Sequence, residues 1–257
     1  MPGVDSHWVQ QYTKFGSYEN EIARGNVRNA YPVSTYGKLT TAGAASMALI
    51  RDFGGTVLNV PAGVSLNIVS TSANDDAAGT GVRTVVLEYL NDDLELSFEV
   101  LTLDGLTPVA TVANDIRWVQ GLHGATFGSG GKAAGNISVT NGGTTYGRIS
   151  TGQRTMHSSF YRVPAGKRLY INSLYGGSSS GTASSSTLIE LATTQVNGLD
   201  QQATGLFYTS AGIALQDSST TLTLNMPLPV GSGHIVGFVA TTDKGATMTA
   251  GFTGWVE

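Results

Sequence analysis

The sequence has no cysteine among its 257 residues. Disulfides, thiolate catalysis and cysteine-ligated zinc are therefore excluded. Charged residues are scarce, at 12% of the chain, against about 25% in ordinary soluble domains. The net charge is −4 and no basic cluster occurs. We therefore expect no binding to nucleic acid, because such binding needs Lys and Arg side chains to neutralise phosphates.

Long apolar runs are missing as well. No stretch of about 18 apolar residues occurs, so we expect no membrane-spanning helix. The first ten residues, MPGVDSHWVQ, have neither the positive charge nor the apolar segment of a signal peptide, and we expect no export signal.

Small and β-branched residues dominate the rest of the chain, which has 34 glycines and is 40% hydrophobic. Disordered chains combine high charge with low hydrophobicity, so this composition predicts a folded, all-β protein. The pattern is clearest in a strand over 82–90, which the turn formers Asn91-Asp92-Asp93 connect to a second strand. In that second strand apolar residues alternate with polar ones, which predicts a dry face made of Leu94, Leu96, Phe98 and Val100.

The first 44 residues differ from the rest because aromatic residues are dense and aliphatic ones sparse. Trp8, Tyr12 and Phe15 follow the spacing of one helix face, which predicts a short helix that ends at Gly16. We interpret 1–44 as an arm that is either a disordered or locally packed tail or an anchor for a partner subunit. The residues predicted to bind that partner are Trp8, Tyr12, Phe15, Tyr18 and Tyr31.

An internal repeat indicates a duplication. Val60-Pro61-Ala62-Gly63 recurs as Val163-Pro164-Ala165-Gly166, a turn in which proline presets φ and glycine takes the left-handed conformation. Matches continue downstream: Leu66, Ile68 and Ser70 with Leu169, Ile171 and Ser173 at the same offset of 103 residues, then Leu87-Glu88 with Ile189-Glu190 at an offset of 102. The repeat predicts two β-sandwich units, at 45–145 and 146–257, after the arm at 1–44.

Motifs that could carry chemistry all have a simpler interpretation. Gly177-Ser178-Ser179-Ser180-Gly181 and Gly128-Ser129-Gly130-Gly131-Lys132 lack the helix that a nucleophile elbow or a phosphate loop needs, and we interpret them as loops. The acidic triplets at 74–76 and 91–93 suit turns, with calcium binding as the alternative. Glu88, Glu95 and Glu99 are expected on a solvated sheet face rather than in a glycosidase site. We predict no catalytic residue, no metal and no cofactor.

Two stretches resemble structural proteins of tailed bacteriophages. They are Ser70–Val109, with its acidic turn, a strand containing Glu99-Val100-Leu101-Thr102-Leu103-Asp104-Gly105, then Thr107-Pro108-Val109, and the later Tyr161–Lys167. Tyr89-Leu90-Asn91 departs from the Gly-Leu-Asp more usual at that turn, which leaves the hairpin geometry open. The resemblance implies a virion component with two tandem jelly-roll-like antiparallel β-sandwiches, no enzyme activity and homo-oligomers.

Three functions follow as hypotheses. The first is a capsid decoration (cement) protein, a trimer on the capsid exterior that is assembled in the host cytoplasm and braces the major capsid protein. The second is a tail, neck or fibre component of the virion. The third, from another class, is a carbohydrate-binding module, which would need several exposed aromatic residues on one sheet. The aromatic residues of the body are instead scattered along the sequence, at Tyr89, Trp118, Tyr146, Tyr170, Tyr175 and Trp255.

Overall fold

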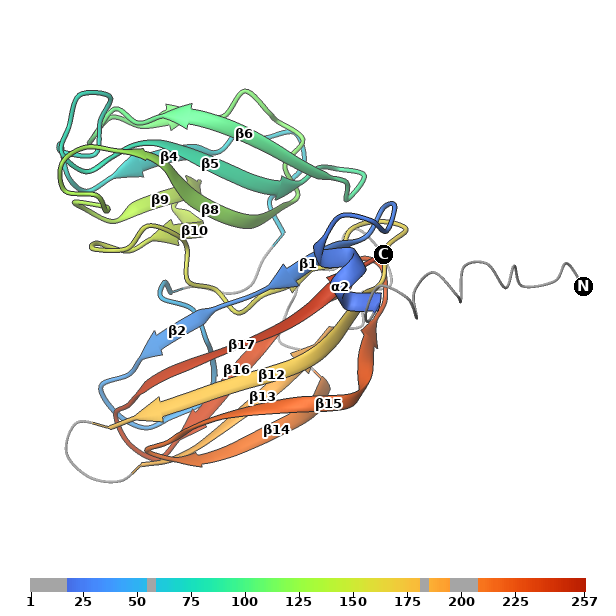
Figure 1. Cartoon of the computed structure of the whole chain (residues 1–257). Coiled ribbons are helices and arrows are strands. Elements are labelled where there is room, and N and C mark those ends of the chain that lie inside the picture. Colours follow the sequence, from blue (N-terminus) through green and yellow to red (C-terminus); the bar gives the residue numbers. More distant parts are fainter. Residues whose placement is uncertain (1–17, 55–58, 181–184, 195–207) are drawn as a thin grey trace, which may run out of the picture.

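The computed structural model describes residues 18–54, 59–180, 185–194 and 208–257. Within them the chain is almost entirely antiparallel β-sheet, which confirms the predicted fold class. One short helix, α2 (Tyr18–Ala23), precedes the first strand. The helix predicted around Trp8, Tyr12 and Phe15 lies outside the described residues. Figure 1 shows two β-sandwiches, one above the other, which we call unit one and unit two.

Unit one is formed by the middle of the chain. Its two sheets have the orders β10-β9-β4-β7 and β6-β5-β8, and they enclose a core of aliphatic side chains contributed by alternate strand positions. The strands are β4 (Asn67–Ser70), β5 (Val82–Leu90), β6 (Leu96–Thr102), β7 (Val109–Ala110), β8 (Trp118–Phe127), β9 (Ile137–Asn141) and β10 (Thr144–Ile149).

Unit two has the sheet orders β1-β17-β12-β15, with β2 also on β17, and β11-β16-β13-β14, with β3 also on β16. Its first strands are β1 (Tyr31–Ser34), β2 (Gly37–Thr40) and β3 (Ala45–Leu49). The others are β11 (Tyr161–Arg162), β12 (Leu169–Ser179), β13 (Ser186–Thr193), β14 (Tyr208–Gln216), β15 (Ser219–Val230), β16 (Ile235–Thr242) and β17 (Thr247–Val256).

The two units share one arrangement of six consecutive strands. The order β9-β4-β7 in unit one corresponds to β17-β12-β15 in unit two, and β8-β5-β6 corresponds to β16-β13-β14. Consecutive strands thus pass between the two sheets in the same sequence in both units. The repeated turn precedes the first of the six strands each time, and Gly63 and Gly166 have φ of +72° and +67°. The sequence repeat therefore coincides with a repeat of structure.

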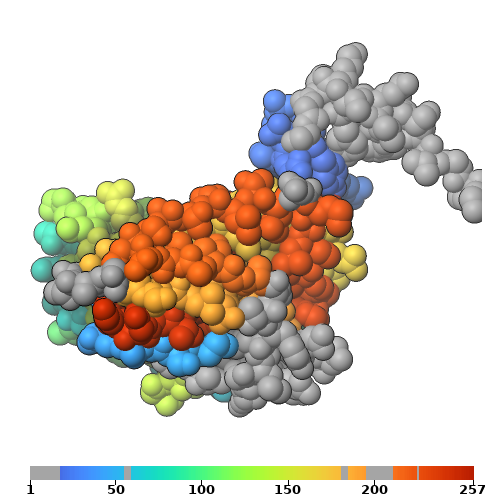
Figure 2. Space-filling view, turned by 90° about the horizontal axis from the view of Figure 1, so that it is seen from below, coloured from blue at the N-terminus to red at the C-terminus, as the bar shows by residue number. Residues whose placement is uncertain are grey.

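Unit one is inserted into unit two rather than placed before it. Strands β1 and β2 pair with β17, and β3 pairs with β16, so residues 31–49 complete the C-terminal sandwich. Figure 2 shows the light-blue residues near position 40 lying against the red strand β17. The sandwiches thus do not follow the boundaries predicted at 44/45 and 145/146: part of the predicted arm is strand, and residue 146 lies inside β10. Pairing between residues some two hundred positions apart leaves no local pattern in the sequence.

The junction between the units is held by buried polar groups. Gln120 of β8 donates to the carbonyl of Arg162 at 2.9 Å and accepts from the amide of Arg162 at 3.1 Å. The guanidinium of Arg162 donates to the side chain of Asn59 at 2.6 Å. A small apolar cluster packs beside them, in which Leu90, Leu94 and Trp118 of unit one meet Phe160, Ala192, Ile235 and Val239 of unit two. Because the polar groups are buried and paired, the junction fixes one orientation of the units.

Candidate functional site

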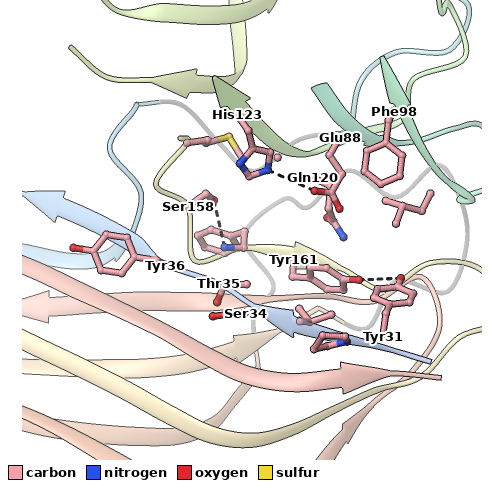
Figure 3. Close-up of a pocket in the computed structure, with 16 residues that line it drawn as sticks. Tyr31, Ser34, Thr35, Tyr36, Glu88, Phe98, Gln120, His123, Ser158 and Tyr161 are labelled. Atoms are coloured by element: carbon pink, nitrogen blue, oxygen red, sulfur yellow. Dashed lines mark hydrogen bonds and ion pairs between the residues drawn. The ribbon is translucent and has the colours of Figure 1, made fainter. Parts of the chain in front are cut away.

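A cleft of about 460 Å³ lies between the two units and is the candidate site (Figure 3). Its upper wall comes from β5, β6 and β8 of unit one, and its lower wall from β1 and β11 of unit two. The lining side chains that matter below are Tyr31, Glu88, Phe98, His123 and Tyr161. Both walls carry aromatic rings as well as polar groups, so the cleft can take a ligand that is partly apolar.

The polar groups of the cleft form two facing pairs. On the upper wall a nitrogen of His123 lies 3.6 Å from a carboxylate oxygen of Glu88. On the lower wall the hydroxyls of Tyr31 and Tyr161 lie 3.4 Å apart. Burial raises the pKa of both tyrosines, so they are neutral hydroxyls that can donate or accept hydrogen bonds. The sequence places Glu88 on a solvated sheet face, whereas in the structure Glu88 lines the cleft opposite residues of unit two.

The structure corrects the prediction that Phe98 and Val100 of β6 lie on a buried face. Phe98 is 58% exposed and Val100 is 68% exposed, whereas Leu101, on the opposite face, is 5% exposed. The register with β5 is the reason: its core residues Val85 and Leu87 stand opposite Leu101 and Glu99. The predicted dry face was therefore wrong at Phe98 and Val100, and the edge strand β6 turns an apolar row outward.

Glu99 organises the edge beside this row. Its carboxylate accepts from the amides of Val112 at 2.8 Å and Ala113 at 3.2 Å, which draws the segment after β7 (Val109–Ala110) alongside β6. Val112, whose amide Glu99 holds, is 91% exposed. Phe98 and Val100 form the exposed apolar row on the outer face of β6, opposite the face from which Glu99 extends.

Of the five residues predicted to bind a partner, Trp8, Tyr12 and Phe15 lie outside the described residues. The other two contact this chain's own C-terminal strand. The Tyr18 hydroxyl donates to Glu257 and its ring meets that of Trp255 edge to face at 6.2 Å. Tyr31 pairs with Val256 in the sheet and lines the cleft. Both aromatic residues thus help to attach the N-terminal part of the chain to unit two.

The first acidic triplet has a structural role in this fold. Asp75 is fully buried and accepts four hydrogen bonds, from Ser70 and from the amides of Val82, Ala134 and Gly135. Its oxygens are thus occupied by the protein itself, as the turn interpretation expects and the calcium alternative does not. Across the described ranges, no three His, Asp or Glu side chains gather as metal ligands.

A second cavity, also of about 460 Å³, adjoins the segments that link the units. The amide of Asp52 donates to the carbonyl of His157 at 3.1 Å, and the His157 ring meets that of Tyr36 edge to face at 4.9 Å. Burial raises the pKa of Asp52 and lowers that of His157. In each residue the uncharged form is favoured, which suits a packed linker.

Within the described part of the chain, no helix is long and apolar enough to span a membrane.

Comparison with known proteins gives only distant likenesses. No protein-family model and no curated protein matches the chain. A structure of infectious bursal disease virus, Gx strain, is 10% identical with a TM-score of 0.24, and the match covers 88% of this chain and 72% of that one. The crystal structure of the VP2 subviral particle of the same virus is 9% identical with a TM-score of 0.14, covering 88% and 76%. These neighbours are proteins of virus particles, but at such TM-scores the likeness carries no argument about this chain.

Proposed function

We propose that this chain is a non-enzymatic structural protein of a virion, and specifically a decoration protein on the capsid exterior of a tailed bacteriophage. The observation that carries the proposal is the duplication: two sandwiches with the same strand order are joined into one body by the Gln120–Arg162 junction. The resemblance of 70–109 and 161–167 to phage structural proteins points the same way. A rigid body of this kind suits a part that braces a shell.

The surface supplies contact areas for such a role. On unit one, Phe98 and Val100 form an exposed apolar row on the outer face of β6, and on unit two Met226 of β15 is 82% exposed. Exposed apolar patches mark interaction sites more often than isolated apolar side chains do. In this proposal the partners are the major capsid protein and further copies of this chain in a trimer, assembled in the host cytoplasm.

A binding experiment with undecorated heads tests the proposal. Purified protein is mixed with the heads and co-sedimentation is measured, followed by reconstruction of the particles. Saturable binding with density at regular positions on the capsid supports the decoration role. Binding to tails, or none to any part of the particle, contradicts it.

The aromatic residues predicted as the anchor need a variant that keeps the body intact. Deletion of 1–40 is unsuitable because it removes β1 and β2 from unit two. The triple substitution Trp8→Ala, Tyr12→Ala, Phe15→Ala leaves every described strand in place. If these residues anchor the protein, the triple variant binds heads more weakly than a Leu106→Ala control, which removes an exposed apolar side chain (62% exposed) that no proposed contact uses. Equal binding contradicts the anchor.

Carbohydrate binding is the second candidate function, and the cleft is the specific observation that favours it. Tyr31, Tyr36 and Tyr161 lie there with Phe98 and the carboxylate of Glu88, although they are far apart in sequence (Figure 3). Aromatic faces and hydrogen-bonding groups together can hold a sugar ring. A glycan array in which Tyr31→Ala removes the hits would support this function, and an array without hits would contradict it.

A further inference from the structure

The outer face of the sheet β6-β5-β8 is a surface that the described part of the chain leaves partly uncovered. By the strand register, Phe98 stands beside Glu88, and Val100 stands beside Val86, which in turn stands beside His123. One end of this face forms the upper wall of the cleft. The other end carries Val100, which is 68% exposed, on an edge strand that pairs with β5 alone among the described strands. An apolar row on a sheet edge is a docking surface for another chain segment.

The described chain begins against the sheet of unit two whose strand β1 forms the lower wall of the cleft. The ring of Tyr18 contacts that of Trp255, and Trp255 stands opposite Pro32 in the sheet. Pro32 lines the lower wall of the cleft, and Phe98 lines the cleft above. Tyr18 is therefore linked to the lower wall of the cleft through its ring contact with Trp255, the strand partner of Pro32.

The 17 residues before Tyr18 are long enough to reach the outer face. A flexible chain of that length spans roughly 23 Å on average and about 56 Å when extended. The face itself, from Phe98 to Thr102 along β6, measures about 14 Å. The segment carries Trp8, Tyr12 and Phe15, whose spacing would place three rings on one side of a helix.

We infer that residues 1–17 of this chain dock on the outer face of the β6-β5-β8 sheet of the same chain, with Trp8, Tyr12 and Phe15 against Phe98 and Val100. The same chain is the occupant because a tethered segment has an effective concentration of about a millimolar, which a second copy at micromolar concentration does not match. The inference concerns the free protein, and its tests are carried out without heads.

Because the chain has no cysteine, two introduced cysteines are the only thiols that can form a disulfide. Tyr12→Cys is combined with Val100→Cys, the purified full chain is oxidised at micromolar concentration, and the products are separated without reductant. We expect a disulfide within one chain, confirmed by peptide mass spectrometry. The matched control combines Tyr12→Cys with Met226→Cys, a residue that is also exposed, at 82%, but lies on unit two. We expect the Val100 pair to close at least about tenfold faster than the Met226 pair.

Each other outcome contradicts the inference. Equal rates for the two pairs would mean that the segment has no preferred site. A cross-linked dimer from the Val100 pair would make a second copy the occupant. Hydrogen exchange gives a measurement without cysteines: exchange of the β6 amides should rise at least about threefold in the Trp8→Ala, Tyr12→Ala, Phe15→Ala variant, because covered strand edges exchange slowly. Unchanged exchange would refute the docking. Neither result depends on binding to heads.

Discussion

Replacing Asp75 by asparagine should destabilise unit one strongly, although the two side chains have nearly the same shape. One carboxylate oxygen of Asp75 accepts from the amides of Val82 at 2.8 Å and Ala134 at 2.9 Å. The other accepts from the Ser70 hydroxyl at 2.6 Å and the amide of Gly135 at 2.8 Å. The side chain thereby joins the loop between β4 and β5 to the segment that leads into β9, across both sheets of unit one.

The magnitude follows from counting donors. An asparagine has one acceptor oxygen, and its NH₂ group must replace the other oxygen. In the better orientation the NH₂ faces Ser70, whose hydroxyl can accept, and Gly135, whose amide cannot. The buried Gly135 amide is left without a partner, at about 1–3 kcal/mol, and each of the three remaining bonds loses its charged acceptor, which weakens it by about 1 kcal/mol. We expect a loss of about 4 kcal/mol, or about 10 °C in melting temperature.

Differential scanning calorimetry of Asp75→Asn measures this loss. The matched control is Asp76→Asn, because Asp76 accepts a single hydrogen bond, from the amide of Ala78 at 2.7 Å, and asparagine can keep it. The control should melt within about 2 °C of the wild type. If Asp75→Asn also melts there, the hydrogen bonds are not worth what their burial implies. A rise in melting temperature on adding calcium would reinstate the calcium alternative.

Three further predictions concern the turns, the linker and the junction. Gly63→Ala and Gly166→Ala should each cost about 1–2 kcal/mol, measured by urea unfolding, because a side chain there meets no atom within 4 Å and only the left-handed φ is strained; unequal costs would contradict this. Burial raises the pKa of Asp52, so its stabilising contribution is lost as pH rises from the ordinary value of 3.8 through the folded value. Asp52→Asn should therefore melt at a higher temperature than the wild type at pH 7 but not at pH 3. A variant that melts below the wild type at pH 7 would mean that burial does not raise the pKa of Asp52. Gln120→Leu removes the bonds to Arg162 and should split one calorimetric transition into two, whereas a single transition would mean that apolar packing alone couples the units.

The sequence was informative where structure is local. The turn Asn91-Asp92-Asp93 connects β5 and β6 as predicted, because the Asn91 side chain accepts from the amides of Asp93 and Glu95 within the same few residues. The duplicated turns that end at Gly63 and Gly166 could also be predicted, because proline and glycine two residues apart specify the backbone conformation of the turn. These features depend on residues that are close together in the sequence, so a local sequence pattern can predict them.

The cleft could not be predicted in the same way. Tyr31 and Tyr161 come together only because β1 and β11 belong to the unit that surrounds the insertion. Nothing near either residue in the sequence indicates the other. Glu88 and His123 pair across adjacent strands, β5 and β8, but their shared environment is created by unit two.

The exposed row of Phe98 and Val100 on β6 shows why the alternating pattern predicted the wrong buried face. Both faces of the strand carry apolar residues, since Leu101 and Leu103 continue the opposite face from Phe98 and Val100. The alternation fixes that two faces exist but not which one is buried. The pairing of β6 with β5 decides this, because Val85 and Leu87 are already in the core. The apolar row then remains outside, next to the cleft that the insertion creates. A row left exposed by the register, beside a cleft and within reach of an aromatic segment, is the reason to look for an occupant there.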